Sequence, residues 1–185
     1  MTRALVVIDV QESFRARSSW AQFNNQHIAV AVQRLVDDAR AAGDLVVWVL
    51  HSEPGSGTTF DPASGFVRLF DELEAAPGEP VLVKTAHNAF TTTNLAQLLT
   101  GRRVHDLTVC GIRTEQCVET TARLASDLGY GVTFVTDATA TSPIERPGAP
   151  TLTPAQIVER TEAALAGRFA TVKTVDELVG VPIGG

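Results

Sequence analysis

Three residues with chemically capable side chains follow predicted strands, although they lie far apart in the chain. Asp9 ends the apolar run at 4–8, Lys84 ends the run at 80–84, and Cys117 comes shortly after a third run. Each also has an ordinary structural interpretation, as a turn former, a solvated strand end or a small buried residue. Taken together, a nucleophile, a carboxylate that can accept its proton and a cation that steadies both charges predict covalent catalysis.

Cys117 lies near the start of a predicted helix, after a strand at 107–111 that turns at Gly111. Thr114 is a suitable N-cap for this helix and Gly129 a suitable C-cap. A thiol in the first helical turn sits among unpaired backbone N–H groups at the positive end of the helix dipole. The position therefore predicts a lowered thiol pKa and donors for an oxyanion.

Strands and helices alternate along the rest of the chain. Strands are predicted at 4–8, 45–50, 80–84, 107–111, 131–137 and 169–174, and helices at 28–42, 66–74, 95–101, 114–128, 154–167 and after Thr174. Strands this apolar are typical of a parallel sheet covered on both faces. We expect one α/β domain over 1–185, with a doubly wound, Rossmann-like, six-stranded parallel sheet. Right-handed crossovers then place all strand ends, and the three capable residues, at one edge.

Composition narrows the class of protein. The chain is 44% hydrophobic and 19% charged, which is typical of a globular domain. Its net charge of -6 comes from interspersed acidic and basic residues, so no nucleic-acid surface is predicted. The apolar runs are too short to span a membrane, and the N-terminus does not read as a signal peptide. With two cysteines unsuited to a stapling disulfide, a cytoplasmic location is expected.

Several motifs resemble the isochorismatase-like cysteine hydrolase family, which includes nicotinamidases and other amidohydrolases. They are VVIDVQ around Asp9, the spacing from Lys84 to Phe90, GIRTEQCV ending just after Cys117, and VTDATATS. The matching motifs occur in the family's order between residues 4 and about 142. GIRTEQCV is the most specific of them.

The resemblance implies a catalytic triad of Asp9, Lys84 and Cys117. It also implies a cis peptide bond between Ile112 and Arg113, with the backbone amides of Arg113 and Cys117 forming an oxyanion hole. Members of the family commonly assemble as homo-oligomers, so a dimer or tetramer is expected.

One departure concerns metal binding. Nicotinamidases of this family carry an Asp-x-His pair after the second strand, whereas Val49 and His51 occupy those positions here. No two of the four histidines have a spacing typical of ligands. We therefore predict no metal and no cofactor, and expect His51 to form a loop hydrogen bond or to contact substrate.

Further residues are candidates for the wall of the substrate pocket. They are Gln11, Phe14, His51, His87, Phe90 and Ile112. For the aromatic residues, simple core packing is an equally open interpretation. Pocket specificity is expected to depend on the loops at 11–22, 51–66 and 138–152, whose conformations the sequence does not determine.

The predicted function is hydrolysis of a small-molecule amide or related C–N bond through a thioester. The alternatives are a non-catalytic member of the family and an isochorismate-type vinyl ether hydrolase. An aspartyl-nucleophile phosphohydrolase needs a second Asp where Gln11 stands, and a dinucleotide-binding protein needs G-x-G-x-x-G after the first strand. Both are therefore disfavoured.

Overall fold

The computed structural model describes residues 2–180, and its core is a six-stranded, all-parallel sheet. The strands are β1 (Thr2–Ile8), β2 (Leu45–His51), β3 (Val81–Lys84), β4 (Val104–Ile112), β5 (Gly131–Ala140) and β8 (Thr171–Lys173). They lie in the order β3-β2-β1-β4-β5-β8. The chain builds outward from β1 first to one side and then, from β4, to the other. The switch in strand order therefore lies between β1 and β4, where ligands bind in sheets of this kind.

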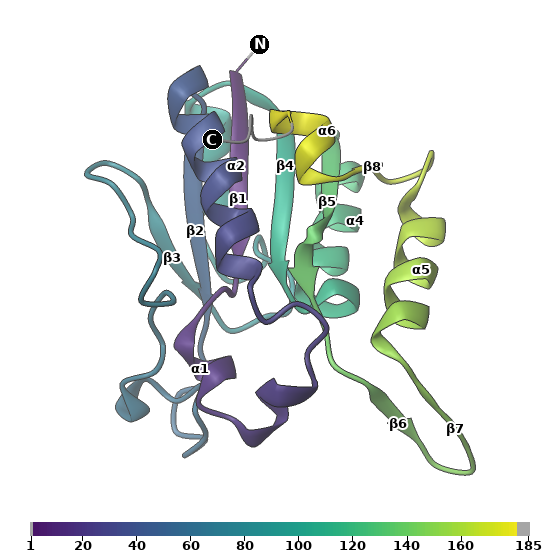
Figure 1. Ribbon diagram of the computed structural model, residues 1–185. Coiled ribbons are helices and arrows are strands. Elements are labelled where there is room, and N and C mark those ends of the chain that lie inside the picture. Colours follow the sequence, from purple (N-terminus) through teal and green to yellow (C-terminus); the bar gives the residue numbers. More distant parts are fainter. Residues whose placement is uncertain (1, 181–185) are drawn as a thin grey trace, which may run out of the picture.

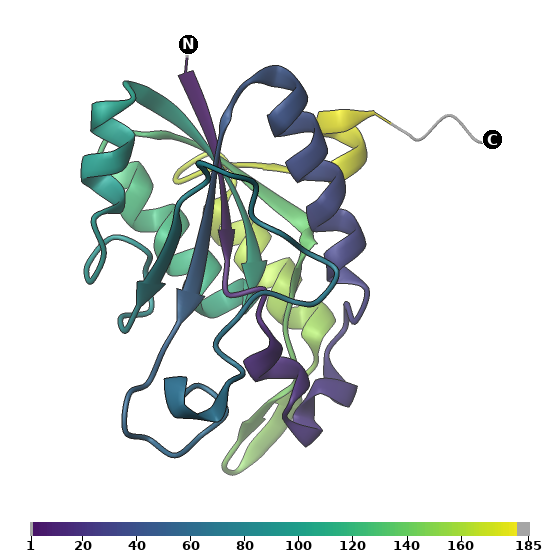
Figure 2. The ribbon, with the colours of Figure 1, turned by 90° about the vertical axis from the view of Figure 1, so that its left-hand side faces the viewer.

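Helices cover both faces of the sheet, which confirms the predicted doubly wound fold (Figures 1 and 2). α2 (Ile28–Ala42) and α6 (Val175–Val179) pack on one face, and their apolar residues share one core cluster with strand residues. α3 (Leu95–Gly101), α4 (Glu119–Asp127) and α5 (Pro154–Leu165) contribute to the second cluster on the opposite face. No helix in the described range is long and apolar enough to cross a membrane.

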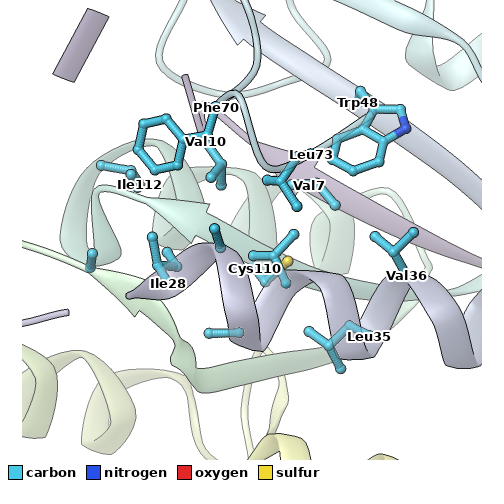
Figure 3. Close-up of a cluster of buried hydrophobic side chains, with 14 of the residues drawn as sticks. Val7, Val10, Ile28, Leu35, Val36, Trp48, Phe70, Leu73, Cys110 and Ile112 are labelled. Carbon is cyan, nitrogen blue, oxygen red and sulfur yellow. The ribbon is translucent and has the colours of Figure 1, made fainter. Parts of the chain in front are cut away.

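The apolar strands form because successive side chains enter opposite cores. Val7, Trp48 and Cys110 point into the cluster beneath α2 (Figure 3). Their neighbours Val47 and Val109 enter the other cluster. The predicted strands are all present, and β5 continues three residues beyond its predicted end, to Ala140.

The helix predicted at 66–74 is absent. This stretch instead runs alongside the segment after β1, where Leu69 and Gln11 form an antiparallel bridge. The Phe70 N–H donates to the Val10 carbonyl at 3.2 Å, and the Glu12 N–H donates to the Arg68 carbonyl at 3.0 Å. Pairing with a distant segment thus supplies the backbone partners that a helix would otherwise have provided.

Threonine side chains cap two helix starts, but the predicted N-cap Thr114 does not cap its helix. Thr153 and Thr174 form complete capping boxes at α5 and α6. Thr114 instead donates its hydroxyl hydrogen to Thr139 Oγ1 at 2.8 Å, and a π-helical turn, Thr114–Val118, precedes α4. Between β5 and α5, part of the predicted loop forms a hairpin of β6 (Ile144–Arg146) and β7 (Ala149–Leu152).

Gly111 allows β1 and β4 to approach closely at the switch point. It has φ +129°, and a Cβ atom at this position would lie 1.9 Å from the Ile8 carbonyl oxygen. We expect Gly111→Ala to lower the free energy of unfolding by roughly 3 kcal/mol or more, because backbone atoms must move apart. Urea denaturation would measure the loss.

Gly148→Ala is the matched control for that experiment. Gly148 also has a positive φ, of +73°, but no atom lies within 4 Å of the place that a Cβ atom would occupy there. Gly148→Ala should therefore lower the free energy of unfolding by about 1 kcal/mol, because of the backbone conformation alone. Equal losses in the two variants would contradict the proposed close contact.

Candidate active site

Asp9, Lys84 and Cys117 meet at the carboxyl edge of the sheet. The Lys84 Nζ atom lies 2.8 Å from Asp9 Oδ2 and donates a hydrogen bond to Cys117 Sγ at 3.3 Å. All three side chains are buried. The structure thus brings together the three residues that the sequence analysis placed at separate strand ends.

Local structure sets each of these positions. Asp9 directly follows β1 with φ 55°, and its backbone N–H donates to the Val49 carbonyl at 2.8 Å. Lys84 is the last residue of β3, two strands away from β1, so its side chain crosses the end of β2 to reach Asp9. Cys117 lies in the π-helical turn that follows β4.

The Cys117 thiol is in a different state from the one predicted. Burial first, and then the negative charge of Asp9, raise the pKa of this thiol to about 12, although Lys84 acts to lower it. The expectation of a lowered pKa was wrong because it considered only the helix start and the cation. At neutral pH the resting group is therefore the protonated thiol, which needs a base to become a nucleophile.

Asp9 has the properties of such a base. Burial raises the pKa of its carboxyl group above the ordinary value of 3.8, while the Lys84 ammonium acts in the opposite direction. Neither carboxylate oxygen has a hydrogen-bond partner among residues 2–180, although Oδ2 forms the ion pair with Lys84. A buried carboxylate with a free oxygen and a raised pKa is suited to accepting and returning a proton.

Cys110 provides the contrast. Its side chain is fully buried in the core beneath α2 (Figure 3), and burial raises the pKa of this thiol to about 12. No charged group is responsible for that shift. Cys110 is thus a packing residue, whereas Cys117 contacts ionisable partners.

A cavity of about 380 Å³ opens above the triad. Its wall is formed by Asp9, Phe14, Arg17, Ser19, Gln22, Phe23, His51, Glu53, Phe60, His87, Arg113, Gln116, Cys117, Ser142 and Pro143. Of the predicted pocket residues, Phe14, His51 and His87 lie in this wall. Gln11, Phe90 and Ile112 are not among the residues that form this wall.

Each of the three has another role. Gln11 is fully buried and uses its amide to bond both the N–H and the carbonyl of His51, at 2.6 and 3.0 Å. Phe90 stacks on Tyr130 with ring centroids 6.0 Å apart, in the cluster beneath α4. Ile112 belongs to the opposite core cluster, which also contains Phe70 (Figure 3).

Several wall residues that were not predicted individually lie in or beside the loops expected to determine specificity. Phe14 packs edge-on against Phe23 at 5.8 Å and against Phe60 at 4.9 Å, joining the first two loops. The segment just after the first loop is joined to the third loop by a reciprocal pair, in which the Asn24 N–H donates to the Thr141 carbonyl and the Thr141 N–H donates to Asn24 Oδ1. All three loops thus form one continuous wall.

The turn before Cys117 borders the same cavity. The peptide bond between Ile112 and Arg113 is cis, as the resemblance implied. The Arg113 carbonyl accepts hydrogen bonds from the N–H groups of Gln116 and Val118, both at 3.2 Å. Its guanidinium is hydrogen-bonded to Ser142, and partial burial lowers its pKa from the ordinary value of 12.5.

The donor groups near His51 do not fit a metal of the kind that nicotinamidases bind. Val49 replaces the carboxylate of the Asp-x-His pair, and both ring nitrogens of His51 face protein groups, Lys84 and Glu53. No group of three His, Cys, Asp or Glu side chains within residues 2–180 has the arrangement of a metal site. We therefore derive no catalytic step through a metal.

Comparisons with known proteins find relatives that match most of the chain. A model of the isochorismatase domain matches residues 3–167. Streptothricin hydrolase from Streptomyces noursei is 36% identical over 97% of this chain and 68% of its own length. Ureidoacrylate amidohydrolase RutB from an Enterobacter species is 30% identical over 74% of each chain. A solved cysteine hydrolase from Pseudomonas syringae superposes with a TM-score of 0.84 at 25% identity, over 96% of this chain and 90% of that one.

Proposed function

Because this chain belongs to the isochorismatase family, whose members are hydrolases, we propose that it is a cysteine hydrolase of small-molecule amides or related C–N bonds. The observation that carries this proposal is the position of Lys84 Nζ, 2.8 Å from Asp9 and 3.3 Å from Cys117. The three side chains together supply the acid–base, cationic and nucleophilic groups of an acyl transfer in one buried cluster.

The first half of the reaction forms a thioester. The Asp9 carboxylate accepts the Cys117 thiol proton, and the sulfur attacks the substrate carbonyl carbon. The resulting oxyanion is held by the backbone amides of Arg113 and Cys117. Asp9 then returns the proton to the leaving nitrogen, the C–N bond breaks, and ammonia or an amine departs.

The second half of the reaction hydrolyses the thioester. Asp9 takes a proton from a water molecule, whose oxygen attacks the acyl carbon. When the tetrahedral intermediate collapses, the C–S bond breaks, the acid leaves, and the proton returns to sulfur. The Lys84 ammonium stabilises whichever of Asp9 and Cys117 carries negative charge.

The names of two relatives support an amide as the substrate. These names, streptothricin hydrolase and ureidoacrylate amidohydrolase, describe hydrolysis, and the second specifies an amide. A cavity of about 380 Å³ lies at the small end of the range for small-molecule sites, which fits a compact substrate.

Incubating the protein with a panel of small carboxamides and ureido compounds, scored by ammonia release, tests this proposal. We expect turnover of at least one member, unaffected by dialysis against a chelator, because Val49 stands in place of the metal-binding carboxylate. Absence of turnover across the panel, together with cleavage of a vinyl ether such as isochorismate, would overturn the amide assignment.

A further inference from the structure

The Lys84 ammonium has three N–H donors and is fully buried, so each donor needs an acceptor within the protein. Nζ forms an ion pair with Asp9 Oδ2, 2.8 Å away, and donates a hydrogen bond to Cys117 Sγ at 3.3 Å. The third polar atom close to Nζ is Nδ1 of His51, also at 3.3 Å. The proposed reaction assigns roles to the first two of these contacts and leaves the third unexplained.

His51 is held firmly in the position that makes this contact. His51 and Lys84 are register partners in the parallel pair of β2 and β3, so their side chains leave the sheet on the same face. The Gln11 side chain bonds both backbone groups of His51. The imidazole ring packs against Phe60 with centroids 5.7 Å apart and stacks parallel to His87 at 6.5 Å.

The neighbours of the ring favour the tautomer that can accept a hydrogen bond from Lys84. Nε2 of His51 lies 3.4 Å from Glu53 Oε1, so the ring proton belongs on Nε2 and the lone pair on Nδ1 faces Lys84. Burial and the charge of Lys84 lower the pKa of His51, against the opposing effects of Asp9 and Glu53. The imidazole is therefore neutral at neutral pH and able to accept.

We propose that His51 is a positioning residue, whose Nδ1 atom accepts the third N–H of Lys84 and so fixes the ammonium between Asp9 and Cys117. The proposal rests on the proposed function, because it assigns His51 a part in activating the same thiol. Without this acceptor, a buried N–H is left unpaired or the ammonium rotates to find another partner. Either change weakens stabilisation of the Cys117 thiolate as it forms.

The reactivity of Cys117 tests this inference without knowledge of the substrate. The rate constant for alkylation by iodoacetamide would be measured at one pH in the Cys110→Ala background, so that one thiol remains. His51→Phe keeps an aromatic ring but has no acceptor. His51→Asn loses the ring but can place its side-chain oxygen close to the position of Nδ1.

We expect His51→Phe to alkylate roughly tenfold more slowly than the parent, and His51→Asn to stay within about threefold of it. His105→Phe makes the same chemical change at an exposed residue near the start of β4 and should match the parent. If His51→Phe does not fold, His51→Leu replaces it as the variant without an acceptor.

The reverse order, with His51→Asn slower than His51→Phe, would show that ring packing matters and would overturn the inference. Equal rates in all variants would also overturn it. Because alkylation needs no turnover, the positioning role of His51 can be confirmed even if every carboxamide in the panel is rejected. Conversely, turnover of a carboxamide together with unchanged alkylation in His51→Phe would leave the hydrolase proposal standing and remove only this inference.

Discussion

Replacing Cys117 with alanine is expected to abolish turnover, with a fall in rate of roughly 10⁴-fold or more, while the protein stays folded. The sulfur forms the covalent intermediate, and Cys117 is the only cysteine among the described residues that line the cavity. Loss of one buried sulfur atom should cost about 1 kcal/mol of stability. Ammonia release and thermal unfolding would be measured on the same preparation.

Cys110→Ala is the matched control for this experiment. It removes the same atom from a thiol that is also buried, but in the core beneath α2 (Figure 3). The stability of Cys110→Ala should fall by a similar amount, and its turnover rate should stay within about twofold of the parent's rate. Substantial turnover by Cys117→Ala would rule out the thioester route.

Replacing Asp9 with asparagine should lower the rate by roughly 10²- to 10⁴-fold, because an amide cannot accept the thiol proton. The pH profile gives a second measure of the same role. Asp9 must be ionised to act as a base, so parent activity should fall as the pH drops through its raised pKa. That acid limb should be missing from the residual activity of the variant.

The control for this variant is Asp44→Asn, which breaks a surface ion pair with Arg3, 2.9 Å long. Partly exposed pairs of this kind contribute little, so neither rate nor pH profile should change. A near-normal rate in Asp9→Asn, or an unchanged acid limb, would mean that another group removes the thiol proton.

The sequence predicted the sheet well because its strands are long apolar runs that enter two cores. Trp48 and Val47, for example, can be adjacent and both buried only in a strand covered on both faces. The segment at 66–74 was misassigned because its backbone partners are Val10 and Glu12, more than fifty residues away. No local pattern in the segment itself reveals such a pairing.

Some features of the active site could likewise be predicted from the sequence, and others could not. The triad residues could be predicted because each follows a strand, and the topology places strand ends at one edge. The role of Gln11 could not be predicted, because its side-chain amide is hydrogen-bonded to the backbone of His51, forty residues further along the chain. The state of the Cys117 thiol was also beyond local reasoning, since burial and the Asp9 charge outweigh the helix start and the cation.

The reciprocal hydrogen bonds between Asn24 and Thr141 constrain how the substrate specificity of this protein can evolve. They couple two loops that are more than a hundred residues apart in sequence, so a substitution that shifts one loop also displaces the other. Variation in the two loops is therefore epistatic. Asp9 and Lys84 lie at strand ends and Cys117 in the turn after β4, none of them in the two coupled loops, so the reaction can stay constant while selection reshapes the entrance through paired changes.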